Sequence, residues 1–330
     1  MENEKKLRVA IVAPVHIQTS EAWTTGLWNE AKESGAHVII VDDSDGKVEL
    51  PWSHDTDGDV YDYADQKAEL GDELYAMFEQ FHKSSACKNF GTWIAWRDGY
   101  DVIIVIDSDC IVSKGFVKAH LEALSKKGKG WDNPLEGTKY YSRGFPYSKR
   151  DLSIVCHMGL WTDTLDLYGT DRVGVTIDDE NPVVKYHTAA APFPLSGMNV
   201  SFTRDMIPYM MFLPNFESGR NKFRRCDDIW GGYIFEKIVA QKGGALSYGL
   251  PYVKHDSIVI PEEDAEEEKA MIKFEDDFYT AIDNALVFSG SGCSAHSGPE
   301  IFAWLSQELG AHEIFGGLRE SLKFWSKLFE

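Results

Sequence analysis

Residues 102–106, with the sequence VIIVI, constrain the fold most, because they form the most strongly apolar short run in the chain. Such a run is typical of a strand that is buried on both faces. Two earlier runs, 7–15 and 36–43, are also rich in β-branched residues, and the segment between them has helical spacing that closes at Gly35. A second helical pattern covers 69–101. This alternation predicts an α/β fold with a mostly parallel central sheet.

The remaining segments set the expected domain organisation. Residues 46–66 are rich in turn formers and predict a loop. The second half mixes short strands and glycine turns with a helix that begins near Asp228. An acidic run at 261–269 and an amphipathic pattern at 320–330 predict a C-terminal helical extension. We therefore expect a main domain at 1–260, with halves at 1–112 and 113–260, followed by an extension at 261–330.

The charge and the cysteines exclude several classes of protein. The chain carries 33 basic and 53 acidic residues, and a net charge of −20 disfavours a nucleic-acid partner. Five widely spaced cysteines without a CxxC pair signal neither a disulfide framework nor a zinc site. No secretory signal and no run long enough to span a membrane is present in the sequence. We expect a cytoplasmic protein in a reducing setting.

Two carboxylates, Asp107 and Asp109, follow the buried run directly. Ligands of α/β folds bind beyond the carboxyl ends of the strands, where Asp43 also follows a strand. Mg²⁺ and Mn²⁺ bind through one or two carboxylates together with substrate phosphates. The alternative is that acidic residues simply end a strand in solvent. The spacing alone fits both, and the buried run before Asp107 favours a ligand site.

Other polar residues allow a functional and a structural interpretation. His255 follows a strand-like segment and is either a third metal ligand or a structural histidine. Asp227 and Asp228 begin a helix, where the helix dipole favours them, and they could also bind sugar hydroxyls or act as a base. Arg143 and Arg150 are either surface charges or a two-pronged grip on a diphosphate. Gly197 permits close approach of a ligand to backbone N–H groups.

Taken together, six motifs in order resemble the reversibly glycosylated polypeptide family, the UDP-arabinopyranose mutases. These are IDSDC, RGFPYSKR, HMGLW, PLSGMNVSF, RCDDIWGGY and GLPYVKH. Weaker similarity runs from IVAPV to FWSKLFE and so covers nearly the whole chain. The resemblance implies a GT-A-like, Rossmann-like fold that binds nucleotide sugars, a UDP-sugar substrate and Mn²⁺ or Mg²⁺ as cofactor. We also expect a homo-oligomer.

The resemblance also implies roles for individual residues. Asp107 and Asp109 match the outer two of three consecutive aspartates that bind metal and diphosphate, and Ser108 replaces the middle one. With His255 they form the expected metal site. The expected nucleotide-sugar ligands are Asp43, Lys88, Asp107, Asp109, Gly197 and Asn199.

The expected catalytic residues are Arg143, Arg150, Asp227 and Asp228. Arg143 matches the arginine that becomes reversibly glycosylated in the family. Because a guanidinium stays protonated in proteins, a neighbouring base would have to activate it, and Asp227 or Asp228 is the candidate.

Three functions remain open at this point. The first is a mutase that interconverts the pyranose and furanose forms of a UDP-sugar such as UDP-arabinose, with self-glycosylation on arginine. The second is a metal-dependent glycosyltransferase that passes the sugar to an external acceptor, and the loss of an aspartate at Ser108 suits that change. The third is a non-catalytic partner subunit of a mutase complex, against which the retention of Asp107, Asp109, Arg143 and Arg150 argues.

Overall fold

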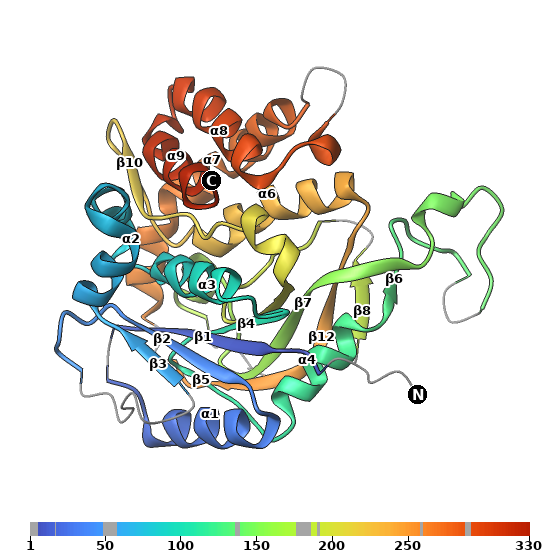
Figure 1. Ribbon diagram of the computed structural model, residues 1–330. Coiled ribbons are helices and arrows are strands. Elements are labelled where there is room, and N and C mark those ends of the chain that lie inside the picture. Colours follow the sequence, from blue (N-terminus) through green and yellow to red (C-terminus); the bar gives the residue numbers. More distant parts are fainter. Residues whose placement is uncertain are drawn as a thin grey trace.

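The computed structural model describes residues 6–16, 18–48, 58–135, 139–175, 186–189, 192–257, 260–287 and 292–330, and structural statements below concern these residues. A ten-stranded sheet with the order β3-β2-β1-β4-β9-β7-β12-β5 forms the centre, with β6 paired to β7 and β8 paired to β12. Helices cover both faces of the sheet (Figure 1). The α/β class expected from the sequence is confirmed.

The first half of the sheet is parallel. It consists of β3 (Gly58–Tyr61), β2 (His37–Asp42), β1 (Val9–Val15) and β4 (Val102–Ile106). The runs predicted as strands at 7–15, 36–43 and 102–106 are confirmed as β1, β2 and β4. The loop predicted at 46–66 is wrong in part, because β3 pairs with β2 at the edge of the sheet.

The second half is mixed, so the expectation of a mostly parallel sheet is wrong there. It comprises β9 (Asn199–Thr203), β7 (Leu152–Asp163), β12 (Ala245–His255), β5 (Cys110–Ile111), β6 (Lys127–Gly128) and β8 (Tyr186–Ala189). Strand β9 runs antiparallel to both β4 and β7. Parallel neighbours need a crossover connection of the βαβ kind. Strand β9 begins at the end of the sheet where β4 finishes, so it runs in the opposite direction and pairs antiparallel. A separate hairpin joins β10 (Phe216–Ser218) and β11 (Asn221–Phe223).

Alternate residues of the central strands form two hydrophobic layers. Ile11 and Ile104 contribute to the layer that contains α1 (Glu21–Ser34) and α4 (Phe116–Leu124). Val12 and Val105 contribute to the layer on the other face. That face is covered by α2 (Tyr63–Phe78), α3 (Lys88–Arg97), α6 (Asp227–Lys242), α7 (Pro261–Ala285), α8 (Gly298–Glu308) and α9 (Arg319–Leu328). The short α5 (Gly169–Arg172) packs against α7.

Two close contacts fix helices near the carboxyl ends of β1, β2 and β4. Gly91 of α3 lies so near the sheet that a Cβ atom there would come within 2.5 Å of Val12 Cγ1. This brings the first residue of α3, Lys88, to the carboxyl edge of the sheet. From the other face, Trp23 Nε1 of α1 donates a hydrogen bond to the carbonyl oxygen of Asp107 at 3.0 Å. The segment after β4 is therefore held from both faces.

The region after residue 260 is helical and shares the main hydrophobic core. Trp230 of α6 stacks on Phe278 of α7, with ring centroids 4.1 Å apart. Trp325 of α9 is fully buried, and its Nε1 donates to the carbonyl oxygen of Pro208 at 3.1 Å. The helix predicted near the C-terminus is confirmed as α9, and the one near Asp228 as α6. The described helices include none that is long and apolar enough to cross a membrane.

Replacing Trp325 with alanine tests whether the C-terminal helices stabilise the whole domain. We expect Trp325→Ala to lower the free energy of unfolding by about 3–5 kcal/mol, because it removes a buried aromatic side chain and leaves a cavity. The control Lys323→Ala changes an exposed side chain of the same helix and should stay within about 0.5 kcal/mol. Urea unfolding followed by circular dichroism measures both. Equal effects of the two variants would contradict a shared core.

Candidate functional site

A pocket lies where β1 and β2 end. It has a volume of about 340 Å³, and its walls include His16, Asp43, Ser44, Asp45, Lys47 and Lys83. Asp107 and Asp109 follow β4. Because β1, β2 and β4 are parallel, these two residues lie at the same end of the strands as the pocket, which we call the carboxyl edge of the sheet. The structure thus brings the two acidic segments predicted from the sequence to one edge.

Asp43 is a buried carboxylate that is held by hydrogen bonds. Its Oδ1 accepts from the hydroxyl of Tyr63 at 3.0 Å and lies 2.7 Å from His82 Nδ1. Its Oδ2 accepts from the backbone N–H of Lys83 at 2.5 Å. Burial and the negative charge of Asp43 raise the pKa of Tyr63, so Tyr63 stays a hydrogen-bond donor. These contacts fix the carboxylate in the wall of the pocket.

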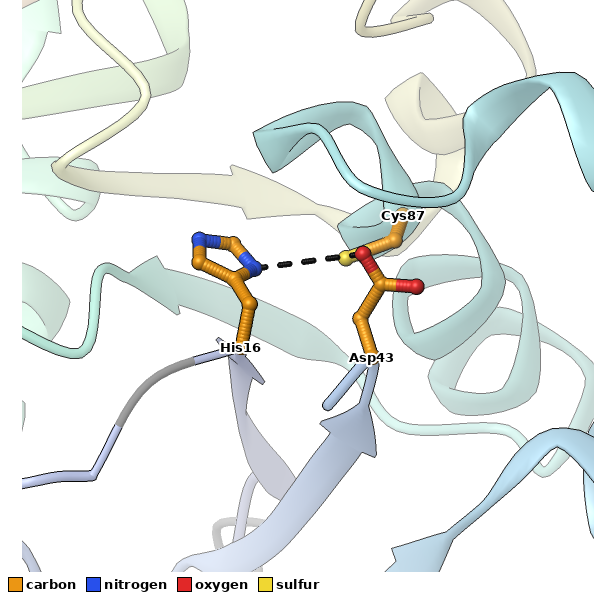
Figure 2. Close-up of side chains that lie close together, drawn as sticks. All are labelled: His16, Asp43 and Cys87. Atoms are coloured by element: carbon orange, nitrogen blue, oxygen red, sulfur yellow. Dashed lines mark ion pairs between the residues drawn. The ribbon is translucent and has the colours of Figure 1, made fainter. Parts of the chain in front are cut away.

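His16, Asp43 and Cys87 meet beside this pocket, as Figure 2 shows. Their candidate ligand atoms all lie within 4.8 Å of one another, with His16 Nδ1 at 3.9 Å from Asp43 Oδ2. Burial and the charge of Asp43 raise the pKa of the Cys87 thiol well above its usual value, which disfavours the thiolate that a metal would need. The oxygens of Asp43 already accept hydrogen bonds. These three residues are therefore better suited to a structural role than to binding a metal ion.

Lys88 supplies a buried positive charge at the edge of the sheet. Its Nζ donates to Asp107 Oδ1 at 2.8 Å and to the carbonyl oxygen of Gly197 at 3.3 Å. Burial alone would lower the pKa of Lys88, but the negative charges of Asp107 and its acidic neighbours raise it. A Cβ atom at Gly197 would lie 3.0 Å from Lys88 Nζ, so this position needs glycine for the ammonium group to fit.

Asp109 and His255 face each other beyond β4 and β12. His255 Nδ1 lies 2.8 Å from the carbonyl oxygen of Thr164 and must donate to it, so Nε2 carries the lone pair when the ring is neutral. Nε2 points toward Asp109 Oδ2 at 3.5 Å. Burial lowers the pKa of His255, but the hydrogen bond and charge of Asp109 outweigh burial and raise it. Asp107, which precedes Asp109 by two residues, is paired with Lys88.

The amino end of α6 adds further carboxylates. Asp228 Oδ2 accepts from the backbone N–H of Gly197 at 2.7 Å, and Asp227 accepts from the hydroxyl of Ser85. Burial, together with the charges of Asp227 and Asp166, raises the pKa of Asp228 from 3.8 to about 8. The surroundings of Asp228 therefore favour its protonated form. The structure brings Asp227 and Asp228 together with Lys88 and Gly197.

Sequence reasoning missed Asp166, which lies close enough to Asp228 for its charge to raise the pKa of Asp228. Burial raises the pKa of Asp166, while the positive charges of His255 and Arg225 oppose the rise. Asp166 follows the carboxyl end of β7 (Leu152–Asp163), as Asp107 follows β4. The rule that singled out Asp107 would also have found Asp166, had the end of β7 been recognised.

Asn199 is placed inside the protein. Its Nδ2 donates to the carbonyl oxygens of Leu160 and Pro251 at 3.0 and 3.1 Å, and its Oδ1 lies 2.9 Å from His120 Nε2. These contacts occupy both donors and one acceptor position of the amide. They favour a structural role for Asn199 over the nucleotide-sugar contact that the sequence predicts.

Arg143 and Arg150 lie on the segment just before β7, at the opposite end of the strands from Asp107. The register across β9 places Ile106 of β4 level with residues 158–159 of β7. Because a strand rises about 3.3 Å per residue, the first residue of β7, Leu152, lies about 20 Å from the Asp107 edge, and Arg150 comes before it in the chain. Arg150 Nη2 donates to the carbonyl oxygen of Phe145 at 2.8 Å, within the same segment. The structure does not bring these arginines to the carboxylates of their own chain.

Comparison with known proteins places the chain in a family. A sequence profile described as "Reversibly glycosylated polypeptide" matches residues 8–330. "Probable UDP-arabinopyranose mutase 1" of Pisum sativum is 28% identical over 244 residues, which cover 68% of this chain and 64% of the pea protein. "UDP-arabinopyranose mutase 1" of Oryza sativa subsp. japonica is 27% identical and is matched over 76% of this chain and 71% of the rice protein. The chain thus covers slightly less than two thirds of the pea relative.

Solved structures show more distant likeness. Glucosyl-3-phosphoglycerate synthase from Mycobacterium tuberculosis, crystallised with Mg²⁺ and UDP, has 11% sequence identity and a TM-score of 0.47. The likeness covers 83% of this chain and 80% of that one.

Replacing Lys88 tests the buried ion pair. We expect Lys88→Met to lower the free energy of unfolding by about 3–5 kcal/mol, because it leaves the Asp107 carboxylate without its partner. The double variant Lys88→Met/Asp107→Asn should recover part of this loss, since neither charge remains. Urea unfolding at neutral pH gives the three values. The control Lys118→Met changes an exposed lysine and should shift stability by at most about 0.5 kcal/mol. No recovery in the double variant would argue against the pair.

Asp228 predicts a pH dependence of stability. Its pKa is about 8 in the folded protein and 3.8 ordinarily, so between these values the folded state binds the extra proton. The contribution is therefore largest at low pH and is lost as pH rises through 8. Asp228→Asn should reduce the fall in unfolding free energy between pH 5 and 7 by up to about 1.4 kcal/mol per pH unit. Denaturant titrations at several pH values measure it.

The matched control for this titration is Asp256→Asn, which changes a half-exposed carboxylate. It should keep the wild-type slope. A wild-type slope in Asp228→Asn would show that Asp228 is ionised throughout this range.

Proposed function

The chain belongs to the reversibly glycosylated polypeptide family, and from this premise we propose that it is a UDP-sugar mutase. Its reaction interconverts the pyranose and furanose forms of a UDP-pentose of the UDP-arabinose type. The observation that supports this most is that the Asp43 pocket and the group of Asp107, Asp109 and His255 lie at the same end of the sheet's strands. A nucleoside and a diphosphate would need such adjacent sites.

Asp43 and the pocket beside it would hold the nucleoside. A volume of about 340 Å³ is within the usual range for small-molecule sites. The carboxylate of Asp43 is already fixed by Tyr63, His82 and Lys83, so it would lose little freedom on accepting a hydrogen bond from uracil or ribose. The exposed side chains of Lys47 and Lys83 at the rim would attract the anionic ligand.

Asp107, Asp109 and His255 have the donor set that suits Mn²⁺ or Mg²⁺. The hydrogen bond from His255 to Thr164 leaves the Nε2 lone pair directed at Asp109, which is the tautomer that a metal ligand requires. Two carboxylates and an imidazole leave coordination positions for phosphate oxygens. A divalent cation bound there would offset the charge of UDP as the leaving group.

Asp227 and Asp228 would donate and accept the protons that move during the reaction. The reaction breaks the bond from the anomeric carbon to UDP, opens the ring, closes it through another hydroxyl and restores the bond to UDP. The old ring oxygen gains a proton as it becomes a hydroxyl, and the hydroxyl that closes the new ring loses one. Asp228, whose pKa is about 8, and Asp227, which accepts a hydrogen bond from Ser85, offer an acid and a base next to each other.

The proposed mutase activity is tested with UDP-arabinopyranose, Mn²⁺ and chromatographic separation of the furanose product. We expect Asp109→Asn to lower kcat by at least about 100-fold, because it removes a charge near the leaving diphosphate. Asp43→Asn should mainly raise KM, since it acts on the nucleoside. The matched control Asp72→Asn changes an exposed carboxylate on α2, outside the residues that line the pocket, and should retain turnover.

Two other outcomes would replace this proposal. Transfer of labelled sugar to an added glycan or protein, without ring interconversion, would favour a glycosyltransferase. Binding of UDP-sugar without any turnover would favour a partner subunit of a mutase complex. Neither outcome affects the stability predictions above.

A further inference from the structure

Residues 129–150, called the arm below, connect β6 to β7, and the described part of this segment, 129–135 and 139–150, projects from the body of the protein (Figure 1). Their composition is opposite to that of the rest of the chain. The arm holds five basic and two acidic residues, a net charge of +3, whereas the remaining residues hold 28 basic and 51 acidic ones, a net charge of −23. A basic segment on an acidic protein is a surface that attracts acidic partners.

The arm also carries exposed aromatic and apolar side chains. Four of the eleven large hydrophobic residues exposed in the described part of the chain lie there: Trp131, Leu135, Tyr140 and Tyr147. Tyr147 is 84% exposed, and the Arg150 guanidinium lies over its ring at 4.0 Å. Exposed aromatic residues next to arginine are typical of the centre of a protein interface.

Arg150 organises the arm, whereas Arg143 is exposed. The Arg150 guanidinium stacks on Tyr141 and Tyr147 and donates to the carbonyl oxygen of Phe145. The segment is therefore already shaped before it meets a partner. Arg143 is an exposed side chain of the same segment and presents its charge to solvent.

The arm is far from the acidic site of its own chain. It emerges about 20 Å from the edge that carries Asp107, with the length of the sheet in between. Both of its ends are anchored by the pairing of Lys127 with Ser153. To reach its own site, the arm would have to lose the Arg150 contacts and fold back across the protein.

The edge that carries the site is acidic and partly open. Asp109 is 33% exposed in its side chain, and the next acidic residue along this edge, Asp256, is 54% exposed. The backbone N–H of Asp256 donates to the carbonyl oxygen of Asp109 at 2.9 Å, which keeps the two carboxylates on one surface. The nearby ammonium of Lys88 is buried and already paired with Asp107. An arginine added to the rim lysines and a bound cation would hold a diphosphate at this edge more tightly.

We propose that the arm of one copy of the chain docks at the acidic edge of a second copy and supplies Arg143 to the site there. The charges of the two surfaces are complementary, and each copy carries both, so every site in a closed assembly is completed by a neighbour. The exposed aromatic residues of the arm would be covered at this interface. Arg143 would bind the diphosphate of the UDP-sugar with its two-pronged donor set. This last step rests on the proposed function.

The docking itself is tested by sedimentation equilibrium, without any substrate. We expect the full chain to form dimers or larger closed assemblies, and Arg143→Glu/Tyr147→Ala to weaken association at least about tenfold, because it reverses a charge and removes an aromatic contact. The control Lys118→Glu reverses an exposed charge on α4 and should not change association. A monomeric wild-type protein, or equal association of both variants, overturns the proposal.

Mixed assemblies decide whether Arg143 acts in the neighbouring copy. Arg143→Ala and Asp109→Asn should each be inactive alone. When the two are co-expressed, random assembly places an intact site next to an intact arm in about one quarter of positions, so about a quarter of wild-type activity should return. If Arg143 acted within its own chain, no position would hold both residues, and no activity would return.

The two tests separate failure of the inference from failure of the proposed function. If the wild type interconverts the sugar and the mixture stays inactive, supply of Arg143 by a neighbour is wrong and the mutase function stands. If the wild type shows no turnover, the proposed function is wrong, and sedimentation still decides whether the arm is an interface.

Discussion

A buried ammonium group holds the acidic edge of this protein together. Lys88 donates to Asp107 and to the carbonyl of Gly197, whose N–H in turn donates to Asp228. Lys88 can lie there only because Gly91 lets α3 approach the sheet and Gly197 leaves room for the ammonium. Carboxylates from β4 and α6, which are far apart in sequence, thereby gather at one place without mutual repulsion forcing them apart.

The environments of these carboxyl groups differ although their chemistry is the same. Asp43 accepts three hydrogen bonds, Asp109 faces an imidazole, and Asp228 is half-buried next to other acids. Hydrogen bonding favours the charged form, and burial near like charges favours the protonated form. One edge of the sheet therefore offers a fixed anion, a position suited to a cation and a proton donor.

Much of the parallel half of the fold was predictable because it depends on local patterns. The apolar run at 102–106 and the capped helix between β1 and β2 carry their own signals of length, periodicity and termination. Strand β3 was missed because four residues at a sheet edge, among many turn formers, carry little pattern. The mixed half depends on β9, whose direction follows from a long connection rather than from its own residues.

The sequence by itself determined the α/β class, the acidic residues at the strand ends and the resemblance to a family. Only the tertiary structure decided which of these residues meet. It joined Asp109 to His255, added Asp166, engaged Asn199 in the interior and separated Arg143 from the carboxylates. The physical reason is that residue type and spacing act over a few positions of the chain. Strand order, register and burial depend on contacts between residues that lie dozens of positions apart.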